Sequence, residues 1–109
     1  MVDQSVMDRV RRYIAAAEAL GVPVTRAVLY GSAARGTADE WSDIDLIIVS
    51  PIFDLPDARS KVDLLWRATT ATEGYVEPLA CGEIRWREDD GSPILEVARR
   101  EGIEVFPEA

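Results

Sequence analysis

The feature that most constrains the fold is a pair of short apolar runs joined by a small polar segment. The first run covers residues 24–30 and leads into Gly31 and Ser32. The second covers residues 46–49 and follows directly on Asp43-Ile44-Asp45. Short runs rich in apolar and β-branched residues, bounded by turn residues, are typical of buried strands. We therefore expect strands at 24–30 and 43–49, with a polar loop between them.

Asp43 and Asp45 are candidate metal ligands. Side chains alternate between the two faces of a strand, so these carboxylates share one face while Ile44 points to the core. Two adjacent carboxylates repel each other, and a cation that both ligate removes that cost. Hard oxygen ligands suit Mg²⁺, which is usually held by one or two carboxylates together with substrate phosphates.

The residues between the two runs suit the binding of phosphate groups. Gly31 and Ser32, in a tight turn that leads into a helix, offer backbone N–H groups and a hydroxyl. Glycine also permits an unusual φ and a close approach of the ligand. Arg35 lies about one helical turn beyond Ser32 and would act as a cationic clamp, with an ordinary surface arginine as the alternative. Ser42 either orients the loop before Asp43 or is a simple polar loop residue.

Size and charge exclude several classes of protein. With 109 residues, 48% of them hydrophobic and 29% charged, we expect one globular domain over residues 1–109. No apolar run is long enough for a membrane helix, and the N-terminus shows no secretory signal. The 12 basic and 20 acidic residues give a net charge of −8, which disfavours nucleic acid as a partner.

The residue types that are rare or missing exclude further chemistry. The chain has no histidine, which rules out Ser-His-Asp, Cys-His and histidine-based zinc sites. Its one cysteine, Cys81, cannot form an internal disulfide, and we expect it to be a small hydrophobic residue at a strand end. A single cysteine fits a reducing compartment, so we expect the protein to be cytoplasmic.

The remaining pattern alternates between helices and strands. We expect helices near 6–20, 31–35 and 57–72, a helical turn at 83–89 and a last helix from Pro93 to Gly102, with an irregular connection at 51–56. Further strands are expected at 75–80 and 103–106, and Pro78 marks the first of these as an edge strand or a strand end. This order predicts an α/β fold and leaves the strand order open.

The spacing of Gly-Ser and Asp-x-Asp resembles the signature of the DNA polymerase beta-like nucleotidyltransferase superfamily. More narrowly, the chain looks like a minimal nucleotidyltransferase, a small class often paired with HEPN-domain proteins. The residues that carry the resemblance are Gly31, Ser32, Arg35, Gly36, Ser42, Asp43, Asp45 and Leu46. The resemblance implies the nucleotidyltransferase fold, a small mixed β-sheet with helices packed against it.

The resemblance also implies roles for individual residues. Asp43 and Asp45 would hold Mg²⁺, with two ions at the site, and Gly31 and Ser32 would contact the β- and γ-phosphates of an NTP. Members of the family usually carry a third carboxylate, most often Asp, on a later strand. Glu77 is the candidate here, as a ligand of the second metal or as the base for the acceptor hydroxyl.

The activity implied by the resemblance is Mg²⁺-dependent transfer of a nucleoside monophosphate, AMP from ATP, to a hydroxyl. The chain leaves no room for a domain that holds the acceptor, so we expect that a partner protein supplies it. The antitoxin of a HEPN/minimal nucleotidyltransferase pair, which adenylylates its helical toxin partner, would fit. The alternative is a catalytically weak nucleotide-binding module that neutralises a partner by contact alone. Whether the chain forms a homo-oligomer is left open.

Overall fold

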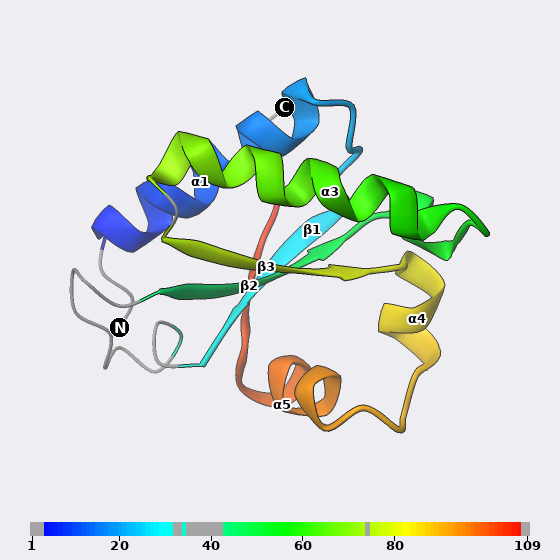
Figure 1. Ribbon diagram of the computed structural model, residues 1–109. Coiled ribbons are helices and arrows are strands. Elements are labelled where there is room, and N and C mark those ends of the chain that lie inside the picture. The colour runs from blue at the N-terminus through cyan, green and yellow to red at the C-terminus, as the bar shows by residue number, and fades with distance from the viewer. Residues whose placement is uncertain (1–3, 32–33, 35–42, 74, 108–109) are drawn as a thin grey trace.

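A computed structural model describes residues 4–31, 34, 43–73 and 75–107 of the chain. Helices and strands alternate along the chain, as the sequence predicts (Figure 1). The elements, with η denoting 3₁₀ helices, are α1 (Gln4–Ala19), β1 (Arg26–Tyr30), β2 (Ile44–Val49), η1 (Pro51–Asp54), α3 (Ala58–Ala68), η2 (Thr69–Thr72), β3 (Val76–Cys81), α4 (Glu83–Glu88), α5 (Pro93–Glu101) and β4 (Ile103–Val105). Among these elements, no helix is both long and apolar enough to cross a membrane.

The four described strands form one mixed sheet, which confirms the expected fold class. Their order is β3-β2-β1-β4. Strand β1 runs antiparallel to β2 and β4, whereas β2 and β3 are parallel. A parallel pair needs a crossover connection, and the segment η1–α3–η2 supplies it. The central strands β1 and β2 are therefore held from both sides.

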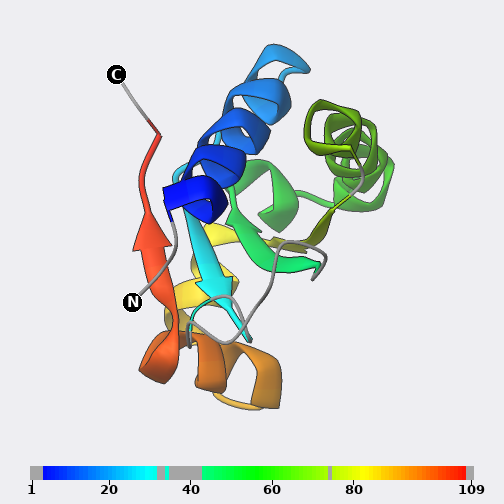
Figure 2. The same cartoon turned by 90° about the vertical axis from the view of Figure 1, so that its left-hand side faces the viewer.

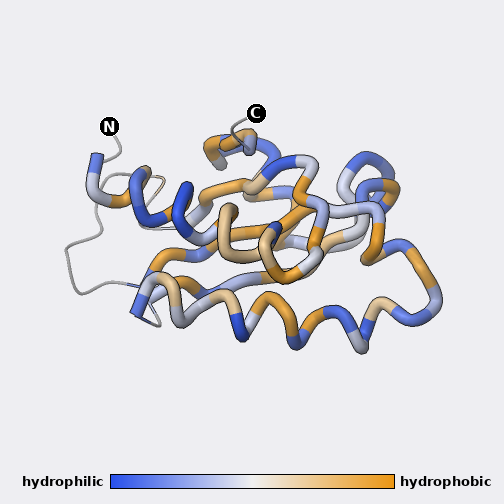
Figure 3. The backbone as a smooth tube through the Cα atoms, turned by 90° about the horizontal axis from the view of Figure 1, so that it is seen from above, coloured by the Kyte–Doolittle hydropathy of each residue, from blue (hydrophilic) through white to orange (hydrophobic). Residues whose placement is uncertain are grey.

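Helices cover both faces of the sheet. In Figures 1 and 2, α1 and α3 lie on one side and α5 on the other, with α4 beside it. The residues buried beneath α1 and α3 form the larger core cluster, which includes Tyr13, Leu29, Leu46 and Leu65. The cluster on the α4 and α5 side includes Val28, Ile47, Trp86 and Leu95. The helices alternate between hydrophilic and hydrophobic residues along their length (Figure 3), as expected when each buries only one side.

Strand β3 lies at an edge of the sheet, as Pro78 predicts. The amide of Ile44 donates to the carbonyl of Tyr75, and the amide of Ser50 donates to the carbonyl of Cys81. Because the backbone groups of successive strand residues point in opposite directions, odd-numbered residues of β3 bond to β2. Pro78 therefore directs its nitrogen, which carries no hydrogen, away from the ladder and costs the sheet no hydrogen bond.

The crossover segment differs from the sequence prediction in two places. Residues 51–54, expected to be irregular, form η1, and the side chain of Ser50 accepts a hydrogen bond from the amide of Ile52 at its start. The helix expected to run to residue 72 ends as α3 at Ala68 and tightens into η2. The reason is a row of threonines, Thr69, Thr70 and Thr72, whose hydroxyls each donate to a carbonyl three residues earlier.

Two expectations from the sequence, a helix end at Gly74 and a helix at 31–35, fall wholly or partly on residues that the structure does not describe. Gly74, expected to end the helix before β3, lies outside the described residues, and Glu73 directly before it has a φ of 59°. Of the helix expected at 31–35, only Gly31 and Ala34 are described, and Ala34 is helical. The other elements agree with the sequence prediction to within a few residues, including Cys81 as the buried last residue of β3.

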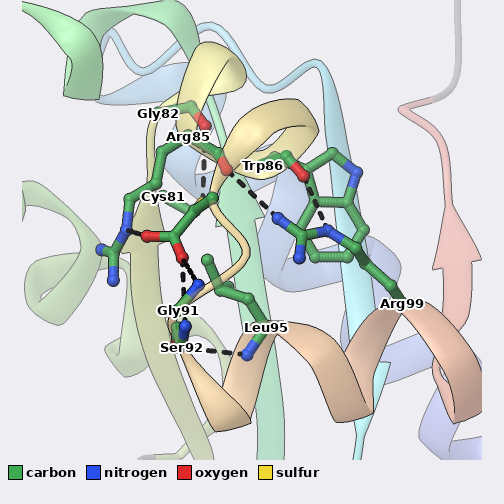
Figure 4. Close-up of polar contacts among 9 residues, drawn as sticks. Cys81, Gly82, Arg85, Trp86, Gly91, Ser92, Leu95 and Arg99 are labelled. Carbon is green, nitrogen blue, oxygen red and sulfur yellow. Dashed lines mark hydrogen bonds and ion pairs between the residues drawn. The ribbon is translucent and has the colours of Figure 1, made fainter.

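The connection between α4 and α5 is held by polar contacts (Figure 4). Oδ1 of Asp89 accepts hydrogen bonds from the amides of Gly91 and Ser92 at 2.9 and 3.0 Å, and Oδ2 accepts one from Arg85 at 3.2 Å. The amide of Gly91, followed by the Arg85 side chain, lowers the pKa of Asp89. Arg99 in turn stacks on the ring of Trp86 and donates to its carbonyl at 2.8 Å.

We predict that Asp89→Asn lowers stability at neutral pH and that its disadvantage disappears in acid. A carboxyl whose pKa is lowered on folding adds stability above its ordinary pKa, and this is lost as the pH falls through the lowered value. Asn keeps an oxygen for the two amides, but it loses the charge and, because its Nδ2 is a donor, the hydrogen bond from Arg85. Urea unfolding of both proteins at neutral pH and at pH values progressively below the ordinary pKa of Asp measures the difference, and a constant difference would contradict the prediction.

Candidate functional site

Three side chains line up across the sheet at one end of its strands. The register places Tyr30, the last residue of β1, opposite Asp45 of β2. It also places Asp45 opposite Glu77 of β3. Residues paired in register lie on the same face of a sheet. Tyr30 packs against the cluster beneath α4 and α5, so the row lies on that face.

The row continues to Asp43, which directly precedes β2 and is exposed, as is Glu77. Hydrogen bonding of the protonated Glu77 carboxyl to Asp43, followed by the Asp43 charge, raises the pKa of Glu77. Desolvation, the Asp45 charge and a hydrogen bond to Asp45 raise the pKa of Glu77 further. The fold thus brings together Asp43, Asp45 and Glu77, which the sequence places up to 34 positions apart.

Asp45 leaves no space for a side chain at Gly31. Its φ is +72°, a conformation that residues with a side chain rarely adopt. A Cβ placed on Gly31 would lie 2.6 Å from Oδ2 of Asp45, which is too close for any real contact. The absence of a side chain at this position therefore gives the Asp45 carboxylate its room.

The carboxylates fit a divalent cation by their chemistry. Oxygen ligands on neighbouring strands are what Mg²⁺ takes in proteins, and the mutual repulsion that raises the pKa of Glu77 is the cost that a cation would remove. Within the described residues, however, no group of three or more Cys, Asp or Glu side chains is arranged to hold a metal ion. The carboxylates would therefore have to rearrange to hold one together.

Other expected site residues cannot be placed. Ser32, Arg35 and Ser42 lie outside the described residues, and so does Gly36. Leu46, which also carries the resemblance, is fully buried in the core. The part of the site that the structure describes therefore consists of Gly31, Asp43, Asp45 and Glu77.

Tyr30 is a site neighbour that the sequence did not indicate. Burial, followed by the charges of Asp45 and Glu77, raises the pKa of its hydroxyl, which therefore stays protonated as a potential donor. In the sequence it is only the last residue of an apolar run before Gly31. Its place beside the carboxylates depends on the register between β1 and β2, which a sequence pattern does not specify.

Comparison with known proteins identifies relatives of this fold. A family model described as a nucleotidyltransferase domain matches residues 10–91, well over half of the chain. A search of curated proteins finds no significant match. A solved structure described as "Crystal structure of the toxin-antitoxin with AMP-PNP" superimposes with a TM-score of 0.60 at 20% identity. That match covers 90% of this chain and 73% of the other chain.

We predict that Asp45→Asn stabilises the protein in metal-free buffer. The substitution keeps the shape of the side chain beside Gly31 and removes one of three neighbouring negative charges. Because these groups are partly exposed, the gain in free energy of unfolding should be about 0.2–1 kcal/mol. Urea unfolding in EDTA measures it, with Asp63→Asn on the exposed side of α3 as the control. A clear loss of stability in Asp45→Asn would show that the carboxylate has a structural role.

Proposed function

Because the chain belongs to the nucleotidyltransferase domain family, we propose that it transfers a nucleoside monophosphate, AMP from ATP, to a hydroxyl of a partner protein with the help of Mg²⁺. The observation that carries the proposal is the meeting of Asp43, Asp45 and Glu77 beside Gly31 at one end of the strands. Three carboxylates gathered at a cost in repulsion indicate a site kept for binding a cation.

In this reaction, different residues of the chain would bind the metal ions, bind the triphosphate and accept the proton. Asp43, Asp45 and Glu77 would hold two Mg²⁺ ions. When bound, these ions would neutralise the phosphate charges and lower the pKa of the acceptor hydroxyl. The backbone at Gly31 and Ser32, with Arg35, would bind the triphosphate. The acceptor oxygen forms a bond to the α-phosphorus, the bond to the β-phosphate oxygen breaks, and pyrophosphate leaves. Glu77 would accept the proton of the acceptor hydroxyl.

Two observations support a protein as the acceptor. The net charge of −8 disfavours a nucleic acid. The fold neighbour described above is a toxin–antitoxin structure with AMP-PNP, which supports ATP as the donor and a toxin as the partner. We therefore place this chain as the antitoxin of such a pair, acting in the cytoplasm on a helical HEPN-type partner. This assignment rests on likeness to the family.

The second candidate function is a nucleotide-binding module that neutralises its partner by contact alone. It is favoured by Glu77, which stands where the family more often has Asp. It is also favoured by the arrangement of the described carboxylates, which form no group of three that could hold a metal ion. Displacements of about 1 Å at a reacting centre can cost much of the rate, so this geometry bears directly on activity.

We predict that Mg²⁺ and ATP together raise the Tm more than either does alone. A ligand that binds only the folded state stabilises it by mass action, about 2.7 kcal/mol at a hundredfold excess over Kd. The double variant Asp43→Asn/Asp45→Asn should lose the joint shift, while Asp63→Asn should keep it. Thermal unfolding followed by circular dichroism measures the shifts. Equal shifts in the wild type and the double variant would remove the proposed site.

We predict that Glu77→Gln abolishes transfer to the partner and leaves partner binding intact, because it deletes a charge with little change in shape. Glu77→Asp should retain or improve transfer, since it restores the more common carboxylate. Mass spectrometry of a purified HEPN-type partner, incubated with the protein, ATP and Mg²⁺, would show the added mass of one nucleoside monophosphate.

The same experiment separates the two candidate functions. Without the partner, the free protein should turn over little ATP, because the acceptor hydroxyl is not held in line with the α-phosphate. If the partner binds and its mass stays unchanged with both the wild type and Glu77→Asp, the transferase proposal fails and the binding module stands.

A further inference from the structure

The separation of Asp43 and Glu77 depends on how β2 and β3 begin. Asp43 precedes the first residue of β2, and Glu77 is the second residue of β3. Both side chains are exposed, so no packing around the carboxylates fixes them. Just ahead of both carboxylates' strand pairing, the Ile44 amide donates a 2.7 Å hydrogen bond to the Tyr75 carbonyl. Tyr75 therefore attaches the residues that lead into β3 to the start of β2.

Tyr75 is held by a contact with a distant part of the chain. The guanidinium carbon of Arg9 lies 5.3 Å from the centre of the Tyr75 ring, within the range of a cation–π interaction. Both residues are half-buried, which strengthens such a contact relative to a fully exposed one. The Tyr75 amide also donates to the carbonyl of Thr72 at 3.2 Å.

The helix that carries Arg9 is firmly anchored. Val10, which directly follows Arg9, and Tyr13, one turn further along α1, are completely buried. The Tyr13 hydroxyl donates a 2.6 Å hydrogen bond to the carbonyl of Leu65 in α3. Arg9 thus projects from a fixed element, and its contact with Tyr75 links the start of β3 to the main core.

We propose that Arg9 and Tyr75 form a positioning pair that fixes the start of β3, and through it the separation of Asp43 and Glu77. The proposal rests on the proposed function, because it concerns the same carboxylates. Neither residue needs to touch the substrate. The pair acts through the Ile44–Tyr75 hydrogen bond, and carboxylates that share a metal ion tolerate only small errors in placement.

Mn²⁺ binding to the full chain, followed by electron paramagnetic resonance, tests the proposal without requiring activity. Arg9→Gln and Tyr75→Leu should weaken Mn²⁺ binding about threefold to tenfold, the range expected for loss of one cation–π contact. Arg9→Lys and Tyr75→Phe keep the cation and the ring, and should largely restore binding. The control is Arg26→Gln, which removes the cation–π contact with Phe106 and the 2.9 Å ion pair with Glu104 at the opposite end of β1.

Amide hydrogen exchange provides a second measurement that is independent of metal. Arg9→Gln and Tyr75→Leu should speed exchange at Ile44 and leave it unchanged at Ser50, whose amide bonds to Cys81 at the other end of the same ladder at 3.0 Å. Unchanged exchange at Ile44 would overturn the proposal, and so would Mn²⁺ binding equal to the wild type. Equal weakening of Mn²⁺ binding by Arg26→Gln would also overturn it, since the effect would then be a general loss of stability.

Failure of the proposed metal site and failure of the positioning role give different results. If wild-type protein binds no Mn²⁺, the metal site of the proposed function fails, and with it the role of the pair in metal binding. The exchange at Ile44 would still show whether Arg9 and Tyr75 fix the start of β3. If wild-type protein binds Mn²⁺ and the variants bind it equally well, the proposed function stands and only the positioning role fails.

Discussion

The pairing of β2 with a strand on each side is the constraint on which the rest of the structure depends. Through β1 it brings Asp45 beside Tyr30 and Gly31, and through β3 it brings Asp45 beside Glu77. A slip of one residue would turn every side chain of β2 to the opposite face and place Asp45 in the core. Half-buried Asp45 lies between buried Ile44 and Leu46, and this favours the observed register because the slip would bury a carboxylate.

The same register concentrates negative charge in one place. The pKa of Glu77 is raised by Asp43 and Asp45, so the folded protein holds these carboxylates together against their repulsion. Two features of the surrounding structure leave space for the carboxylates. Gly31 lacks the side chain that would collide with Asp45, and the row lies at the end of the strands, where Asp43 and Glu77 remain exposed. A site of this kind is costly when empty, and a cation together with phosphates would offset the cost.

The helices on the two faces of the sheet make different contacts with the end that carries the carboxylates. On the face that carries the row of Tyr30, Asp45 and Glu77, helix α5 is bound to the sheet through Leu95 and Ala98 and to α4 through Arg99. On the other face, α1 is buried along one side, and Arg9 reaches from it to Tyr75 at the start of β3. Side chains from elements far apart in the chain therefore attach helices to both faces of the sheet. Under the proposal above, Arg9 would also support the carboxylates, through Tyr75 and without contacting them.

The sequence by itself determined the elements and the chemical character of the site. Short apolar runs marked the strands, Pro93 marked the start of the last helix, and the spacing from Gly31 to Asp45 indicated a carboxylate site next to a phosphate-binding turn. These features are local, since they depend on the period of the side chains and on the conformations open to glycine and proline. Only the tertiary structure decided the strand order, the partners of Asp45 and the contact of Arg9 with Tyr75. Those depend on which segments meet across the sheet and the core, and a pattern of residue types does not specify contacts between positions 66 apart.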